Sequence, residues 1–233
     1  MRKITINLAA VAAFCIVVAS PALVSSSCAT PKTEQEDTTI IREDSGITAL
    51  KYSSPEVPAS IEFCGKTIDL SRFDRHERMD RELLAFTYMH STSLQMLKKA
   101  NRYFPIVEPI LKENGIPDDF KYLMVIESNM NPTARSSAGA AGLWQFMQGT
   151  GRDYGLEVNN NVDERYHIEK ATRAACRYLK DAYAKYKDWV AVAASYNAGQ
   201  ARIASQLAKQ DVDDSLDLQL VEETARYVYR ILA

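Results

Sequence analysis

The chain has 233 residues, a length that accommodates one ordinary domain together with a leader or linker. Its 28 lysines and arginines against 30 aspartates and glutamates leave a net charge of −2, which excludes a strongly basic nucleic-acid-binding protein. Hydrophobic residues make up 46% and charged residues 25%, so the chain as a whole is not intrinsically disordered. With only nine glycines, eight prolines and little alternation of β-branched residues, the sequence predicts a mainly α-helical protein.

Residues 1–28 have the pattern of an export signal. Arg2 and Lys3 form a basic start, an apolar run over 4–24 follows, and small residues end the segment. The sequence Ser-Ser-Ser-Cys that ends at Cys28 resembles a lipoprotein processing site, in which Cys28 carries the lipid. Ordinary signal cleavage near Ala29 is the alternative, and both predict that the protein leaves the cytoplasm.

Residues 29–60 are rich in Thr, Glu, Ser and Pro and show little hydrophobic periodicity, which is typical of a flexible tether. The following residues, 61–233, form the predicted folded domain. We divide it into an N-terminal helical part over 61–115 and a core over 116–233. Its first segment, 61–68, is predicted to be extended.

Apolar residues recur at helical spacing through most of this domain. One helix is predicted over 74–103, and a separate short helix over 105–113, because Pro105 suits the first turn of a helix. The same spacing predicts helices over four further segments: 120–129, 168–186, 189–196 and 222–233. The last helix has no stop signal, so we expect the natural chain to continue beyond Ala233.

Two of the four cysteines, Cys64 and Cys176, lie in the predicted domain. In an exported protein they could form a disulfide bond. They could equally remain two thiols buried as small hydrophobic side chains. The sequence leaves both alternatives open.

Glu127 occupies an unexpected position in the helix predicted over 120–129. It follows Phe120, Leu123 and Met124 by seven, four and three residues, so helical spacing directs it toward the same interior face. An unpaired buried carboxylate keeps its proton to higher pH, and a carboxylic acid that is protonated near neutral pH can act as a general acid. Pairing with a basic residue, or capping of the next loop, would also explain the position.

The loop after Glu127 is rich in small residues. Five of the nine glycines lie within 130–156, and the segment Gly-Leu-Trp-Gln-Phe-Met ends at Met147. Small residues let the backbone line a groove, Gln145 supplies a bidentate amide, and the Trp144 and Phe146 rings could stack on a sugar. This pattern favours a sugar-binding strip, whereas the alternative is a turn into a packed helix with Trp144 in the core.

Five motifs, taken in order and spacing, resemble those of the lytic transglycosylases, in particular their membrane-bound type D group. They are Glu127-Ser128 with Asn131-Pro132, the Ala-Ala-Gly-Leu-Trp-Gln-Phe-Met segment 140–147, Tyr-Gly-Leu at 154–156, Val-Asp-Glu-Arg at 162–165 and Ser-Tyr-Asn-Ala-Gly at 195–199. The resemblance extends over roughly residues 60–233.

This resemblance implies a lysozyme-like helical domain of the goose type, known as the SLT domain, after the export signal and tether. It implies a lyase that cleaves the β-1,4 bond between N-acetylmuramic acid and N-acetylglucosamine and leaves a 1,6-anhydromuramic acid end. Glu127 would be the sole catalytic acid and base: it protonates the glycosidic oxygen and then takes the proton of the muramoyl 6-hydroxyl. No cofactor is implied.

The motifs also imply which residues bind substrate: Ser128, Gly142, Leu143, Gln145, Met147, Tyr196, Asn197 and Glu223. For Glu223 the alternative is a carboxylate that stabilises the N-terminal end of its own helix. The implied partners are peptidoglycan glycan strands and, through Cys28, the outer membrane of the cell envelope. We expect a monomer and no nucleic-acid partner.

The distribution of acidic residues favours a reaction with one carboxylate. The 25 residues from Ser128 to Arg152 contain no Asp or Glu. Glycosidases with two carboxylates need the second one about 5–9.5 Å from the acid. Here only a distant residue such as Glu164 or Glu223 could fold back to supply it.

At three places the chain departs from the pattern common in this family: His167-Ile168, Gln200-Ala201 and Tyr229. The second departure could alter the shape of the cleft near Asn197. His76-Glu77 lacks the second histidine of a zinc motif, and 159–164 lacks the ligand spacing of a calcium loop, so we expect no metal site.

Two alternative functions stay open at this point. A hydrolytic muramidase could use the same fold and would leave reducing ends. A glycan-binding lipoprotein without catalytic activity could use the same sugar-binding strip.

Overall fold

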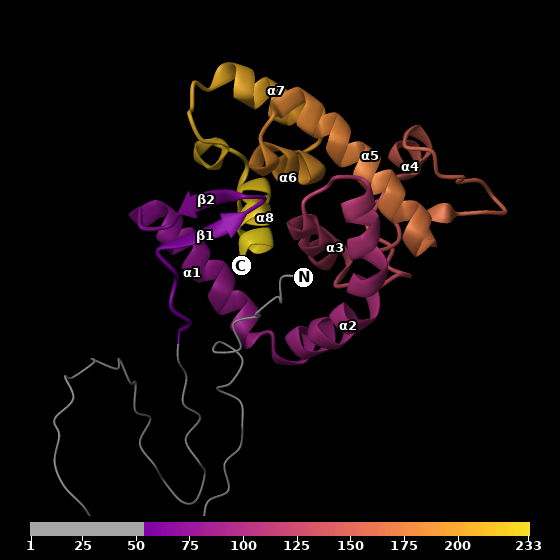
Figure 1. Cartoon of the computed structure of the whole chain (residues 1–233), viewed down its shortest axis with the longest axis horizontal. Helices are drawn as coiled ribbons and strands as arrows, with labels where there is room; N and C mark the ends of the chain where they lie inside the picture. The colour runs from indigo at the N-terminus through magenta and orange to yellow at the C-terminus, as the bar shows by residue number, and fades with distance from the viewer. Residues whose placement is uncertain (1–53) are drawn as a thin grey trace, which may run out of the picture. The chain divides into compact units, whose positions relative to one another are not determined.

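The computed structural model describes residues 54–233. The predicted export signal, the predicted lipidation site Cys28 and most of the predicted tether lie outside the described residues. Residues Glu56–Ala233 form one compact unit that is built mostly of helices (Figure 1), which confirms the predicted mainly α fold class. Among the helices of 54–233, none has the length and apolarity needed to span a bilayer.

The segment predicted as extended is a β hairpin. Strands β1 (Ser60–Phe63) and β2 (Lys66–Asp69) pair antiparallel, with Ile61 opposite Ile68. The two turn residues, Cys64 and Gly65, have φ angles of 52° and 80°, which gives a tight turn between the strands.

The first two helices differ from the prediction. Helix α1 (Phe73–Tyr88) ends at Tyr88, and α2 (His90–Glu113) begins two residues later. Met89, between them, has a ψ angle of 24°. Two prolines, Pro105 and Pro109, lie inside α2, so the prediction that Pro105 begins a helix was wrong.

Packing explains why α2 continues through its prolines. Each proline costs an interior helix about 3 kcal/mol, because it cannot donate a backbone hydrogen bond. Burying one large apolar side chain contributes about 1.5–3 kcal/mol. Four such side chains of α2 are buried: Tyr103, Val107, Ile110 and Leu111. The local cost of the prolines is therefore offset by the contact of α2 with the rest of the core.

The remaining elements follow the prediction more closely. In chain order they are the 3₁₀ turn η3 (Asp118–Phe120), α3 (Lys121–Ser128), α4 (Gln148–Asp153), η4 (Glu164–Tyr166), α5 (Ile168–Tyr186), α6 (Trp189–Ala198), α7 (Gln200–Lys209), η5 (Ser215–Asp217) and α8 (Glu222–Leu232). The helices predicted over 168–186 and 222–233 are confirmed as α5 and α8. Helix α7 was not predicted.

Helix α5 packs against the other helices through one face. Its buried face is built from small residues together with Tyr178 and Leu179, and α2, α6 and α7 contact it (Figure 1). His167, one of the departures from the family pattern, accepts a hydrogen bond from the Lys170 backbone N–H at 3.5 Å and so caps the N-terminal end of α5.

Both cysteines of the domain are free thiols. Cys64 lies half-buried at the hairpin turn, and Cys176 is buried on α5. Burial raises the pKa of the Cys176 thiol to about 11, so it stays protonated at neutral pH. Of the two alternatives, the structure supports buried thiols without a disulfide bond.

Candidate active site

Glu127 lies in the last turn of α3. The helix ends at Ser128 because Asn129 adopts a left-handed conformation with φ 49°, a conformation that asparagine tolerates well. The buried residues of α3 include Leu123 and Met124, and Glu127 lies half-buried beside them. Glu127 therefore lies on the partly buried side of α3, as its helical spacing predicts.

A tyrosine from the last helix holds the Glu127 carboxyl group. The Tyr227 hydroxyl of α8 donates a hydrogen bond of 2.6 Å to Oε1 of Glu127. Burial raises the pKa of Glu127 to about 7, while the hydrogen bond from Tyr227 acts in the opposite direction. The group is therefore partly protonated at neutral pH.

Within residues 54–233 no second carboxylate contributes to this pKa shift. Glu164, one of the two acids that could have folded back, accepts hydrogen bonds from the Glu157 backbone N–H and from Lys170 instead. Glu223 is exposed in the first turn of α8.

Gly142 makes a close backbone contact beside the site. Its N–H donates to the Ala134 carbonyl at 2.9 Å, and its φ is +79°. A Cβ atom at this position would lie 1.9 Å from the backbone oxygen of Arg165. Only glycine fits, because any side chain would force the loop away from the segment that carries Arg165.

Gln145 uses its amide nitrogen within the loop. Nε2 donates to the Gly142 carbonyl at 2.8 Å and to the Ala134 carbonyl at 3.2 Å, and the backbone φ is 48°. Only the amide oxygen stays available for a ligand, so the expected bidentate contact is reduced to a single acceptor.

The aromatic residues on either side of Gln145 do not offer a face to a sugar. Trp144 is 0% exposed and donates from Nε1 to the Thr172 hydroxyl at 2.9 Å, and Phe146 is 3% exposed. The expectation that these two rings stack on a pyranose was wrong. Their burial matches the alternative, in which they anchor the loop in the core.

The buried side chain of Arg165 binds the backbone of the loop that carries Gln145. No role for Arg165 itself was predicted. The guanidinium is buried and donates from Nη1 to the carbonyls of Gly139 at 2.8 Å and Phe146 at 2.9 Å. Asp163 accepts from its Nε and Nη2. The signal was present in the Val-Asp-Glu-Arg motif, whose Asp and Arg form this pair.

Tyr196 and Asn197, at the end of α6, connect the loop to α8. The Tyr196 hydroxyl donates to the Trp144 carbonyl at 2.8 Å, and its ring packs against Phe146 and Tyr178. Asn197 accepts a hydrogen bond of 2.8 Å at Oδ1 from the Thr224 hydroxyl of α8. Its amide N–H groups have no partner within the described residues.

The other predicted binding residues are placed less directly. Ser128 is buried and its hydroxyl donates back to the Met124 carbonyl at 3.1 Å. Leu143 is buried in the core, whereas Met147 is 45% exposed. Of the predicted residues, Tyr196 interacts electrostatically with Glu127 and is hydrogen-bonded to the loop that carries Gln145. Met147 and Glu223 lie exposed, whereas Ser128 and Leu143 are buried.

Two residues of α8 that hydrogen-bond to Glu127 and Asn197 were not predicted as site residues. Thr224 directly follows Glu223 and Tyr227 lies one helical turn after it, yet only Glu223 was predicted to bind substrate. Their side chains are buried, whereas Glu223 is exposed. The buried, apolar face of α8 was the available signal.

The other two departures from the family pattern are also placed. Gln200 lies at the start of α7, where its carbonyl accepts from the Tyr186 hydroxyl at 2.6 Å and its Nε2 donates to Tyr154 at 3.4 Å. Tyr229 is buried on α8, and its hydroxyl has no hydrogen-bond partner within the described residues.

Comparisons with known proteins find relatives of this chain among the lytic transglycosylases. Residues 105–217 match the family model described as the transglycosylase SLT domain. Membrane-bound lytic murein transglycosylase D of Escherichia coli K12 is 31% identical over 162 residues, 67% of this chain and 35% of that protein. Membrane-bound lytic murein transglycosylase C of Haemophilus ducreyi is 29% identical over 150 residues, 58% of this chain and 40% of that protein.

A solved structure, an inactive mutant of lytic transglycosylase Slt from Pseudomonas aeruginosa, is 24% identical with a TM-score of 0.47 and matches 55% of this chain and 22% of that one. The chain spans about a third of the length of its Escherichia coli relative. Over residues 105–217 the chain is thus similar to the transglycosylase SLT domains.

Proposed function

We propose that the protein is a peptidoglycan lytic transglycosylase, a lyase that cleaves the β-1,4 bond between N-acetylmuramic acid and N-acetylglucosamine. One observation carries the proposal: a half-buried carboxyl group, Glu127, has a pKa raised to about 7 and is held by a neutral donor rather than by a cation. A group with this pKa can give a proton and take one back at neutral pH. The similarity to lytic murein transglycosylases supplies the substrate class.

In the first step, Glu127 donates its proton to the glycosidic oxygen. Tyr227 donates to Oε1, which makes Oε1 the acceptor oxygen of the protonated carboxyl group and leaves Oε2 to carry the proton. The bond between C1 of the muramoyl residue and the glycosidic oxygen breaks, and the N-acetylglucosamine leaves with a new hydroxyl group.

In the second step, the Glu127 carboxylate takes the proton of the muramoyl 6-hydroxyl. Its oxygen then bonds to C1 and closes the 1,6-anhydro ring. The carboxyl group is restored, and no water is consumed. The single carboxylate at this site and the acid-free loop from Ser128 to Arg152 support this sequence over one with two carboxylates.

The residues around Glu127 are proposed to bind the glycan. The Asn197 amide points its acceptor at Thr224 and keeps its N–H donors for the substrate, where acetamido carbonyls and hydroxyls are the available acceptors. The Gln145 oxygen accepts from a sugar hydroxyl. Tyr196 fixes the loop through the Trp144 carbonyl and so positions Gln145.

Mass spectrometry of the muropeptides released from purified peptidoglycan tests the proposal. We expect anhydromuramoyl ends from the wild-type protein and a loss of about 10²–10⁴ in rate for Glu127→Gln. Glu169→Gln, a change of an exposed carboxylate on α5, is the matched control and should leave the rate unchanged. Reducing ends would identify a hydrolytic muramidase, and no turnover in the wild-type protein would leave only glycan binding.

We also propose that the protein is exported and held at the cell envelope as a monomeric lipoprotein through Cys28. The signal pattern over 1–28 and the membrane-bound relatives support this location. Metabolic labelling with a radioactive fatty acid should label the wild-type protein and not Cys28→Ala. Equal absence of label in both would favour ordinary cleavage near Ala29.

A further inference from the structure

The two contacts that complete the site come from α8, which lies outside the region matched by the SLT family. The match ends at residue 217, and α8 begins at Glu222. From this helix Tyr227 reaches Glu127 and Thr224 reaches Asn197. The geometry at the catalytic acid therefore depends on how α8 is held.

Helix α8 packs between α1 on one side and α3 and α6 on the other. Arg226 and Arg230 are one turn apart and share a face of the helix. Thr224 and Tyr227 lie roughly 60–160° farther around the same helix. One face of α8 thus binds α1 while the next face carries the contacts to the site.

On α1, these arginines meet a single buried carboxylate, Glu82, which is 1% exposed. Arg226 donates to its Oε1 at 2.7 Å and to its Oε2 at 3.2 Å, and Arg230 donates to Oε2 at 3.2 Å. Arg81 adds a contact to Oε1 at 3.2 Å. Burial opposes ionisation of Glu82, but the arginines outweigh it and hold its pKa below the ordinary value.

This arrangement fixes the rotation of α8 about its axis. Both oxygens of a carboxylate are planar and directional acceptors, and both have guanidinium partners from the same helix face. A tyrosine hydroxyl lies roughly 9 Å from the helix axis, so a rotation of about 20° would move it by about 3 Å and break its hydrogen bond.

We propose that Glu82 is a positioning residue of the active site: through Arg226 and Arg230 it sets the rotation of α8, so that Tyr227 meets Glu127 and Thr224 meets Asn197. The inference rests on the proposed function, in which Glu127 is the acid and base. It also implies that the segment 105–217 alone lacks part of its own site.

Few ionisable groups surround the carboxyl groups of Glu127 and Glu82, so a change in the pH profile can be assigned to one of them. The ionisable groups that interact with Glu127 are Tyr227 of α8 and Tyr196 of α6. Within residues 54–233, Glu82 forms ion pairs with Arg81, Arg226 and Arg230. A change at Glu82 reaches Glu127 through α8, because none of the partners of one carboxyl is a partner of the other.

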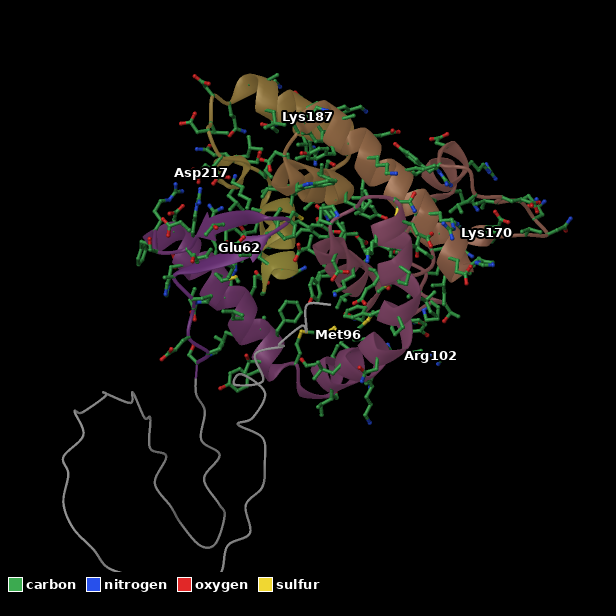
Figure 2. All side chains as sticks on the ribbon, in the orientation of Figure 1. Glu62, Met96, Arg102, Lys170, Lys187 and Asp217 are labelled. Carbon is green, nitrogen blue, oxygen red and sulfur yellow. The ribbon has the colours of Figure 1, made fainter. Side chains whose placement is uncertain are left out.

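The test measures the rate of muropeptide release against pH for the full chain and for Glu82→Gln. We expect a lower rate for Glu82→Gln. We also expect the alkaline limb, the fall in rate as the pH rises above the pKa of Glu127, to move to higher pH by about one unit. The reason is that Glu127 loses the hydrogen-bond donor that favours its ionised form. The matched control is Asp214→Asn, which removes ion pairs to Arg75 and Lys66. Asp217, labelled in Figure 2, belongs to the same cluster, on the side of the molecule that carries the β hairpin. We expect Asp214→Asn to lower thermal stability and leave the limb in place.

A double-mutant cycle separates positioning from general stability. Tyr227→Phe alone should move the limb upward, and adding Glu82→Gln should then move it no further. Arg226→Lys, which keeps the charge but loses the planar fork, should give a smaller shift in the same direction and serves if Glu82→Gln does not fold. The positioning role is overturned if Glu82→Gln and Asp214→Asn change the rate alike without moving the limb. A wild-type profile without any limb near pH 7 would instead contradict the proposed function.

Discussion

Two opposing influences act on the carboxyl group of Glu127. Burial favours its neutral form, and the Tyr227 hydrogen bond favours its ionised form. Burial is the larger of the two, so the pKa comes to about 7 rather than to a value at which the acid would never ionise. In the proposed reaction Glu127 both gives and takes a proton, and this intermediate pKa suits both steps.

Burying the ionised form of Glu127 lowers the stability of the folded protein, and Glu127→Gln should remove this cost. The pKa of Glu127 is raised in the folded state, from 4.5 to about 7. Its contribution to stability is therefore full below pH 4.5 and is lost as the pH rises through 7. We expect Glu127→Gln to be more stable than the wild type at pH 8, by at most about 3 kcal/mol, and equally stable at pH 4.

Urea unfolding at the two pH values measures this difference. Glu169→Gln, on the exposed face of α5, should change stability by less than about 0.5 kcal/mol at both. An equal effect of Glu127→Gln at pH 4 and pH 8 would show that the carboxyl group is not buried in solution.

Gly142 gives a second prediction at the scale of one residue, and Gly139 is its control. Both have positive φ angles, 79° and 90°, so alanine strains the backbone at each. A Cβ at Gly142 also meets the Arg165 carbonyl at 1.9 Å, whereas a Cβ at Gly139 meets nothing within 4 Å. We expect Gly142→Ala to lose about 1–3 kcal/mol more than Gly139→Ala in urea unfolding. Equal losses would mean that backbone strain alone requires the glycine.

Residue-level predictions succeeded where they depended on one helix. Glu127 could be placed inward because its neighbours on α3 define the buried face. Tyr227, 100 residues away, could not be assigned as its partner, because nothing local to either helix specifies which helices meet. Trp144 was misjudged because an aromatic residue beside a glycine-rich turn suits a sugar platform and a core anchor equally well.

At the scale of elements, strong amphipathic patterns predicted helices reliably. The bounds predicted for α5 match those observed, since a continuous apolar face is bounded by an N-cap at His167 and a left-handed Lys187. Pro105 misled the prediction for α2, because a local rule was outweighed by tertiary burial. Helix α7 was missed because its apolar face contains few large side chains and Ile203 alone is fully buried.

The loop that carries Gln145 is held by the ion pair between Arg165 and Asp163. Replacing Asp163 by Asn should therefore destabilise the protein. This change leaves the buried Arg165 without its carboxylate and should cost roughly 2 kcal/mol at pH 7. Hydrogen bonds from Arg165 hold the pKa of Asp163 below its ordinary value of 3.8. The stabilisation is therefore present above pH 3.8 and is lost as the pH falls through the lower, folded-state pKa.

Denaturant unfolding at pH 7 and at pH 2.5 tests the effect of Asp163→Asn. The difference from wild type should be large at pH 7 and should shrink at the lower pH. Asp153→Asn, on the exposed face of α4, is the control and should have little effect at either. A difference that does not depend on pH would mean that the Asp163 charge does not hold the loop.

At the scale of the whole molecule, the site is assembled from helices that are distant in the sequence. Glu127 comes from α3, Asn197 from α6, and their hydrogen-bond donors Tyr227 and Thr224 from α8. Helix α1, at the other end of the unit, holds α8 through Glu82. These contacts join helices from the beginning and the end of the folded sequence. We therefore expect residues Glu56–Ala233 to unfold in a single cooperative transition.

A protein that begins at Glu56 tests this expectation directly. Residues Glu56–Ala233 form one compact unit, so the shortened protein should fold alone and unfold in a single two-state transition. Both tryptophans report on it from different places: Trp144 is buried in the loop beneath the site, and the Trp189 ring stacks on Tyr183 at 4.0 Å. Urea unfolding followed by tryptophan fluorescence and by far-ultraviolet circular dichroism should give coincident curves. Two separate midpoints would show that the helices before the SLT region and the helices within it fold independently, in which case α1 could not hold α8 in place.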